Sequence, residues 1–176
     1  MSDTVWNDAL ISAAAIGSVS DMETALSNGA DINAADSDLQ ETALLLAVQN
    51  GDMEAMEYLI AHEADVNQAN EVGITPLMAA VIYDRPHFLA KLIMADADMN
   101  AEDKNGARAI FFATHLGTKD CLDILCKSGA HLEDISIGQA DKYAFELIDI
   151  DDYMKQRQAA EKQKQRNLRR YIKRGP

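Results

Sequence analysis

The feature that most constrains this chain is an internal repeat with a period of 33 or 34 residues. Three independent series of residues keep this spacing along most of the sequence. They are the alanines Ala13, Ala47, Ala80 and Ala113; the apolar residues Leu10, Leu44, Leu77 and Ile110; and the turn residues Gly17, Gly51, Asp84 and Gly117. In each series the intervals are 34, 33 and 33 residues. A shared period of this length predicts a stacked repeat array rather than one irregular core.

The best-formed repeat is built around residues 75–80, with the sequence Thr-Pro-Leu-Met-Ala-Ala. Thr75 stands where a helix should begin, and its hydroxyl can accept a hydrogen bond from an unpaired backbone N–H. Pro76 follows at the first helical position, where a missing N–H costs nothing. Leu77 and Ala80 are three residues apart and share one face. The pattern predicts a short helix, a turn and a second apolar helix that opens at Pro86.

This unit resembles the ankyrin repeat. The residues that carry the resemblance in the third repeat are Gly73, Thr75, Pro76, Leu77, Ala80, Leu92, Ala97 and Asn100. The resemblance covers residues 5–134 and implies a mostly α-helical solenoid of helix-turn-helix units joined by hairpin fingers. We expect an ankyrin repeat domain over 1–154, and the basic composition of 155–176, whose residues are mostly good helix formers, predicts a basic helical tail. Within the domain we expect four repeats and a degenerate cap, at 5–37, 38–69, 70–102, 103–134 and 135–154.

Several positions depart from the ankyrin pattern and predict local differences. Glu63 and Asp96 replace the glycine that ends the second helix, and Asp84 replaces the glycine between helices, so backbone strain is expected there. Arg108 replaces the threonine that should cap the first helix of the fourth repeat. Gln40 replaces the finger glycine in the second repeat, which also carries one extra residue. That finger is therefore expected to have an unusual shape.

Charge divides the chain into two parts. The net charge is −13, yet residues 1–154 hold 28 acidic and 7 basic side chains, whereas residues 155–176 hold 9 basic and one acidic. The tail places Leu168, Tyr171 and Ile172 at helical spacing. It could cap the last repeat, remain solvated near the acidic body, or bind a partner, an anionic membrane or nucleic acid. Nucleic acid is the weakest of these options, because the acidic body would repel it.

The remaining patterns narrow the class of protein. There is no signal peptide and no apolar run long enough to span a membrane, which predicts a cytoplasmic protein, with secretion as an effector left open. Cys121 and Cys126 are five residues apart in a predicted helix and should be reduced. No nucleotide-binding, zinc-binding or catalytic motif is present. We therefore expect no cofactor, no metal and no enzymatic activity, and a monomer when the chain is alone.

The resemblance implies a partner-binding surface on the finger tips and on the outer ends of the first helices, which line the concave face. The candidates are Leu39, Glu41, Gln49, Asn50, Glu71, Val72, Ile74, Ile82, Tyr83, Lys104, Asn105, His115 and Leu116. We expect an apolar centre at Ile74, Ile82 and Tyr83 with an acidic rim, which suits a protein partner with a basic, partly apolar epitope. Packing between fingers could hide some of these residues. Trp6 could extend this patch, although a cap on the first repeat is favoured. The alternative function is an adaptor that docks through the basic tail.

Overall fold

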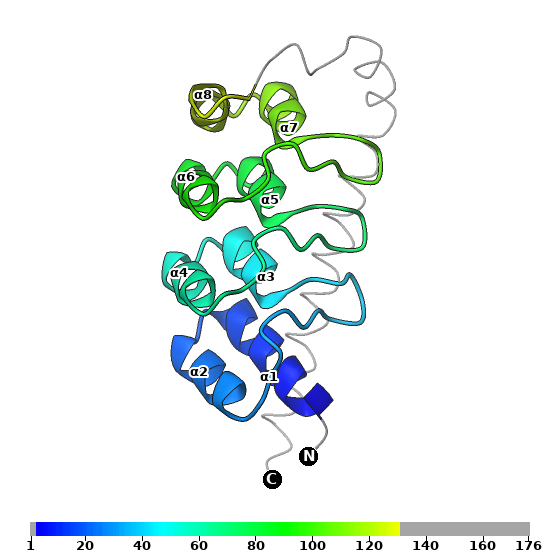
Figure 1. Cartoon of the computed structure of the whole chain (residues 1–176), viewed down its shortest axis with the longest axis vertical. Coiled ribbons are helices and arrows are strands. Elements are labelled where there is room, and N and C mark those ends of the chain that lie inside the picture. The colour runs from blue at the N-terminus through cyan, green and yellow to red at the C-terminus, as the bar shows by residue number, and fades with distance from the viewer. Residues whose placement is uncertain (1–2, 131–176) are drawn as a thin grey trace, which may run out of the picture. The chain divides into compact units, whose positions relative to one another are not determined.

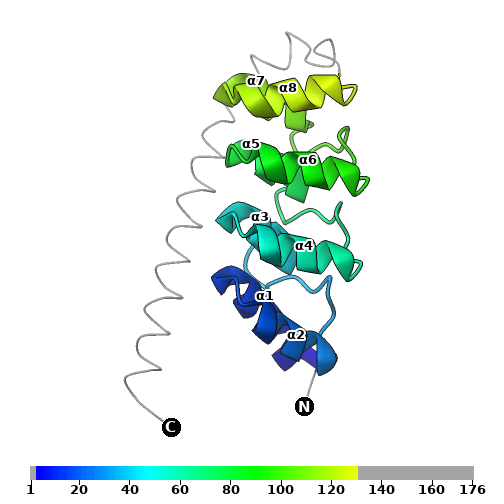
Figure 2. The ribbon, with the colours of Figure 1, turned by 90° about the vertical axis from the view of Figure 1, so that its left-hand side faces the viewer.

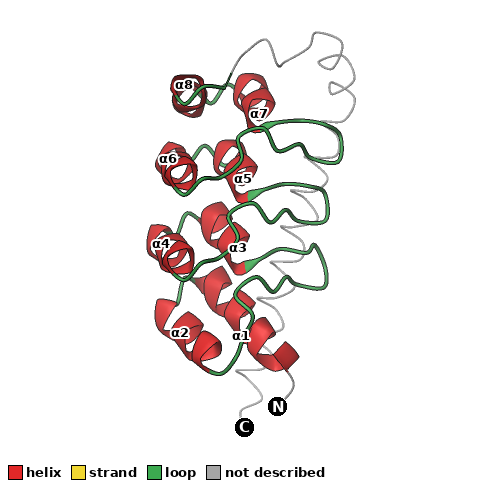
Figure 3. Ribbon diagram, in the orientation of Figure 1, coloured by secondary structure: helices red, strands yellow, loops and turns green. Residues whose placement is uncertain are grey.

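The computed structural model describes residues 3–130, which form four pairs of helices stacked in one direction (Figure 1). Contacts divide the chain after Asp134, so all described residues lie in the first unit, Met1–Asp134. The helices are α1 (Asp3–Ile16), α2 (Val19–Ser27), α3 (Ala43–Asn50), α4 (Met53–Ala61), α5 (Pro76–Ile82), α6 (Pro86–Met94), α7 (Ala109–Leu116) and α8 (Lys119–Lys127). The described residues contain no regular strand (Figure 3).

The helices begin and end where the sequence predicts. The hydroxyl oxygens of Thr42 and Thr75 accept hydrogen bonds from the N–H groups of Leu45 and Met78, at 3.2 and 3.3 Å. Pro76 and Pro86 each occupy the first turn of their helices. Such caps supply partners for backbone donors that the helix itself leaves unpaired. Arg108 makes no capping bond, and α7 therefore begins without side-chain support, as expected.

The eight helices form two layers. Helices α1, α3, α5 and α7 stack into an inner layer next to the fingers (Figure 1), and α2, α4, α6 and α8 stack into an outer layer that faces the viewer in Figure 2. The repeated alanines Ala13, Ala47, Ala80 and Ala113 are at most 3% exposed. Their small side chains allow neighbouring helices to approach closely, and leucines such as Leu44 and Leu77 fill the space between layers.

Each hairpin finger is organised by one side chain at its base. The Oδ1 atoms of Asp36, Asn70 and Asp103 each accept hydrogen bonds from two backbone N–H groups of their own finger. Neighbouring fingers then stack, because Glu71 N–H donates to the carbonyl of Leu39 (2.9 Å) and Lys104 N–H donates to that of Val72 (3.2 Å). The fingers therefore form a continuous edge along the array.

A second ladder joins the loops that follow the outer helices. The side-chain oxygens of Asn7, Asn33 and Asn67 accept hydrogen bonds from the backbone N–H groups of Asp31, Asp65 and Asp98, at 2.7–2.8 Å. The bonds from Asp65 and Asp98 each link one repeat to the next, whereas the bond from Asp31 to Asn7 joins the loop after α2 to α1 within the first repeat. This explains why asparagine recurs at the ends of the repeats, since its amide oxygen replaces a backbone partner in an extended connector.

The predicted backbone departures are confirmed. Glu63, Asp84 and Asp96 adopt positive φ values of 67°, 49° and 61°, where glycine is the favoured residue. Gln40 also has a positive φ, 56°, at the position that Gly73 (89°) occupies in the next finger. The extra residue of the second repeat lies at the tip of its finger, between Asp36 and Leu39. The predicted cap at 135–154, the tail at 155–176 and its residues Leu168, Tyr171 and Ile172 lie outside the described residues.

Candidate protein-interaction surface

Two rows of residues reach the surface on the side of the array that carries the fingers. We define the finger-tip surface as Asp38, Leu39, Glu71 and Val72. We define the helix-end row as the residues at the carboxyl ends of the inner helices, Ile16, Asn50, Tyr83 and Leu116. Both rows run along the array, because equivalent positions of successive repeats lie beside one another (Figure 1).

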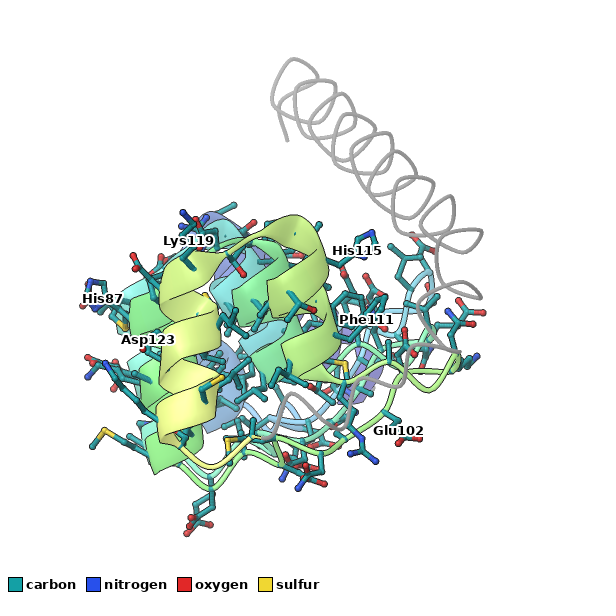
Figure 4. All side chains as sticks on the ribbon, turned by 90° about the horizontal axis from the view of Figure 1, so that it is seen from above. His87, Glu102, Phe111, His115, Lys119 and Asp123 are labelled. Atoms are coloured by element: carbon teal, nitrogen blue, oxygen red, sulfur yellow. The ribbon has the colours of Figure 1, made fainter. Side chains whose placement is uncertain are left out.

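The candidate residues fall into three classes of exposure. The exposed ones are Asn50, Glu71, Val72, Lys104, His115 and Leu116; the half-buried ones are Leu39, Ile82, Tyr83 and Asn105; the buried ones are Glu41, Gln49 and Ile74. His115 and Phe111 extend from α7 on the side away from α8, toward the region that the fingers border (Figure 4). Their rings stack at 5.4 Å between centroids. Most of the exposed and half-buried candidates belong either to the finger-tip surface or to the helix-end row.

The prediction that Ile74 is an exposed apolar contact is wrong. Its side chain is 4% exposed, because the residue after the positive-φ glycine of a finger turns back toward the inner helices. Glu41 occupies the same position in the second finger and is 3% exposed. Its carboxylate accepts a hydrogen bond of 2.8 Å from Nε2 of Gln49, which is also 3% exposed. These three side chains support the fingers from inside.

The apolar part of the surface is therefore displaced from the expected centre. Val72 is 37% exposed and Leu116 is 41% exposed, whereas Ile82 and Tyr83 are half-buried. Ile16 is 71% exposed at the other end of the helix-end row. Sequence reasoning missed Asp38 as an exposed tip residue. Aligning Asp36 with Asn70 and Asp103 by their shared role would have placed the extra residue at the tip.

A polar cluster lies where the turn of one repeat meets the outer helix of the next. The guanidinium group of Arg85 reaches back across Gly51, and its Nη2 lies 3.5 Å from the carbonyl oxygen of Gln49 at the end of α3. The Cζ atom of the same guanidinium group lies 5.8 Å from the ring centroid of Phe88. A cation at this position is favoured by the partial negative charge of a helix carboxyl end. The cluster therefore joins two repeats.

The neighbouring thiol of Cys121 is also structural. Its Sγ lies 3.8 Å from Oδ1 of Asp84, and burial, followed by the charge of Asp84, raises the pKa of Cys121 to about 11. A thiol with this pKa is protonated at neutral pH and is a poor nucleophile or metal ligand. Cys126 is exposed, and both cysteines are free, as expected.

The amino-terminal end of the array carries an open depression of about 350 Å³ lined by Trp6 and by residues of α1 and α2. Two of these, Ser12 and Asp21, are polar and exposed. The equivalent positions of the second repeat are Leu46 and Ala55, which are buried. The first repeat thus carries polar side chains at positions that the inner repeats cover. Such polar positions are typical of a terminal repeat, and the role of Trp6 as a cap stays a prediction.

Within residues 3–130, no group of three His, Cys, Asp or Glu side chains is arranged to hold a metal ion. Among the helices described above, none is long and apolar enough to cross a membrane.

Comparison with known proteins agrees with the repeat geometry. Residues 10–103 match a family model for ankyrin repeats in three copies. The chain belongs to the ankyrin repeat family. Ankyrin repeats are generally non-enzymatic modules that bind other proteins, and this ankyrin repeat protein has the helix pairs and fingers that such modules present.

Curated relatives of this ankyrin repeat protein come from several sources. It is 40% identical over 83 residues to the ankyrin repeat protein FPV031 of Fowlpox virus (strain NVSL), covering 47% of this chain and 24% of the relative. It is 31% identical over 109 residues to Inversin of Canis lupus familiaris, covering 61% and 10%. It is 33% identical over 109 residues to Ankyrin repeat and SOCS box protein 6 of Mus musculus, covering 61% and 26%. The matched region therefore spans about a quarter or less of each of these relatives.

Proposed function

We propose that this ankyrin repeat protein is a non-enzymatic interaction module that holds a partner protein on the concave side of the array. The partner contacts the finger-tip surface and the helix-end row. The single observation that carries the proposal is that two large aliphatic side chains on this side, Val72 and Leu116, are 37% and 41% exposed. Exposed apolar residues gathered along one face are typical of protein-binding sites.

The proposal is tested by placing a charge inside the predicted contact. Val72→Asp and Leu116→Asp should each weaken capture of the partner from the native host at least tenfold, because a desolvated carboxylate would oppose an apolar contact. Met94→Asp is the matched control, because Met94 is 83% exposed on the outer helix α6. All three substitutions are at exposed positions and should leave the melting temperature nearly unchanged. Equal binding by the three folded variants would refute the proposal.

A second function is supported by the charge of the tail alone. Residues 155–176 carry a net charge of +8, which suits an adaptor that docks on an anionic membrane surface or a larger assembly. Deleting this segment should then release the protein from membranes or large complexes without lowering its melting temperature. A lower melting temperature with unchanged distribution would instead make the segment a cap of the array.

The cellular location that we propose is the cytoplasm, with export as an effector as the other option, and the proposed state of the chain alone is a monomer. The proposed partner epitope is basic and partly apolar. Size-exclusion chromatography with light scattering tests the monomer, and fractionation of host cells tests the location.

A further inference from the structure

The charge of the array changes along its axis. Residues 1–84 contain 15 acidic side chains and no lysine or arginine. Residues 85–130 contain six acidic and six basic side chains. Because the repeats stack in one direction, this difference in sequence becomes a difference between the two ends of the array (Figure 1). A partner that crosses several repeats therefore meets a strongly negative potential at α1–α4 and a nearly neutral one at α7–α8.

The same change occurs residue by residue along the fingers. The backbone hydrogen bonds between fingers place Glu71 beside the tip of the second finger and Lys104 beside the tip of the third. The tip position is thus acidic in the second and third fingers (Asp38 and Glu71) and basic in the fourth (Lys104), and all three residues are exposed. The next position changes from aliphatic, Leu39 and Val72, to polar, Asn105.

We infer that the finger-tip surface of the second and third repeats binds a lysine- or arginine-rich segment of another protein, and that Lys104 sets the limit of that contact and fixes the direction in which the segment lies. Carboxylates beside aliphatic side chains complement a cationic segment that also carries an apolar residue. Lys104 repels the cationic part of such a segment if it lies in the reverse direction. This inference rests on the proposed function and adds the chemistry and polarity of the partner.

The test uses the full chain and a synthetic lysine-rich peptide with a central leucine, whose binding is followed by fluorescence anisotropy. The double variant Asp38→Lys/Glu71→Lys should bind this peptide at least tenfold more weakly, because two attractions become repulsions. Lys104→Glu should bind it several-fold more tightly. Two substitutions of the same charge change on the outer helices, Glu54→Lys on α4 and Glu23→Lys on α2, are the matched control and together should change binding less than threefold.

A second peptide, with lysines in one half and neutral residues in the other, reports the direction of binding through a spin label on either end. Relaxation enhancement should be strongest at the second finger when the label is at the lysine-rich end. Equal losses in the finger-tip and outer-helix variants would overturn the inference, and so would equal enhancement from both ends. Deletion of residues 155–176 gives a further outcome. If that deletion tightens peptide binding tenfold or more, the chain's own basic segment is the occupant, and binding of another protein there is overturned.

The failure of this inference can be told apart from failure of the proposed function. If Val72→Asp abolishes capture of the native partner while the charge reversals leave it unchanged, the interaction face is correct and its cationic specificity is wrong. If Val72→Asp and Leu116→Asp leave capture unchanged, the proposed function itself is wrong.

Discussion

The contact between Gly51 and Arg85 gives the sharpest prediction about how the repeats are held together. Gly51 and Gly117 occupy the same repeat position and have left-handed φ values of 76° and 70°. A Cβ added to Gly51 would clash with the guanidinium group of Arg85, whereas a Cβ added to Gly117 would meet none of the atoms of residues 3–130 within 4 Å. The two sites therefore share one backbone cost and differ in one side-chain clash.

The expected free energies follow from this geometry. An alanine in the left-handed conformation costs about 1 kcal/mol, so Gly117→Ala should destabilise the protein by that amount. Gly51→Ala must also displace the guanidinium group, which loses its hydrogen bond to Gln49 and its contact with Phe88, at an additional cost of about 1.5 kcal/mol. The total for Gly51→Ala should therefore be about 2.5 kcal/mol.

Urea unfolding followed by circular dichroism measures both values, and a double-mutant cycle isolates the clash. In an Arg85→Ala background the cost of Gly51→Ala should fall to about 1 kcal/mol, whereas the cost of Gly117→Ala should not change. The reasoning is refuted if the two glycine substitutions cost the same in the parent protein. It is also refuted if removal of Arg85 leaves the cost of Gly51→Ala unaltered.

Three further predictions concern single positions. Thr75→Ala should lower stability by about 1 kcal/mol through loss of the α5 cap, and Thr75→Ser should restore most of it in the same urea assay. Gly73→Ala should cost more than Gly129→Ala, because a Cβ at Gly73 would lie 2.7 Å from the backbone nitrogen of Lys104, whereas a Cβ at Gly129 meets no atom within 4 Å in the described part of the chain; equal melting temperatures would contradict this. The folded protein retains the Cys121 proton up to a pKa of about 11, against a usual 9.0. The protonated thiol therefore makes its full contribution to the free energy of unfolding below pH 9, and that contribution is lost between pH 9 and 11. The free energy of unfolding of the parent protein should fall more steeply with pH over this range than that of Cys121→Ala. Parallel curves of stability against pH for the two proteins would refute the raised pKa of Cys121.

The repeat period was sufficient to predict the helices and their ends. Thr75 and Pro76 encode a helix start in their own covalent chemistry, so no knowledge of distant residues was needed. The positive φ values of Glu63, Asp84 and Asp96 also followed from their places in the repeat. The family match over residues 10–103 confirms the resemblance on which the fold class depended.

The depth of each side chain could not be predicted in the same way. The period shows that Ile74 and Glu41 are equivalent, yet it does not show that this position turns inward to be buried. The role of Arg85 was also missed, because its partner carbonyl at Gln49 is 36 residues away in the sequence and becomes a neighbour only after the repeats stack. The expected binding residues on the exposed rows remain predictions.

Site-specific photo-cross-linking in the native host tests the central claim most directly. A benzophenone amino acid would replace Val72 on the finger-tip surface in one variant and Met94 on α6 in another, two exposed apolar positions on opposite sides of the array. The account predicts one protein adduct from the Val72 position, whose cross-linked peptide is rich in lysine or arginine, and none from the Met94 position. The same adduct from the Met94 position alone would contradict binding on the concave side.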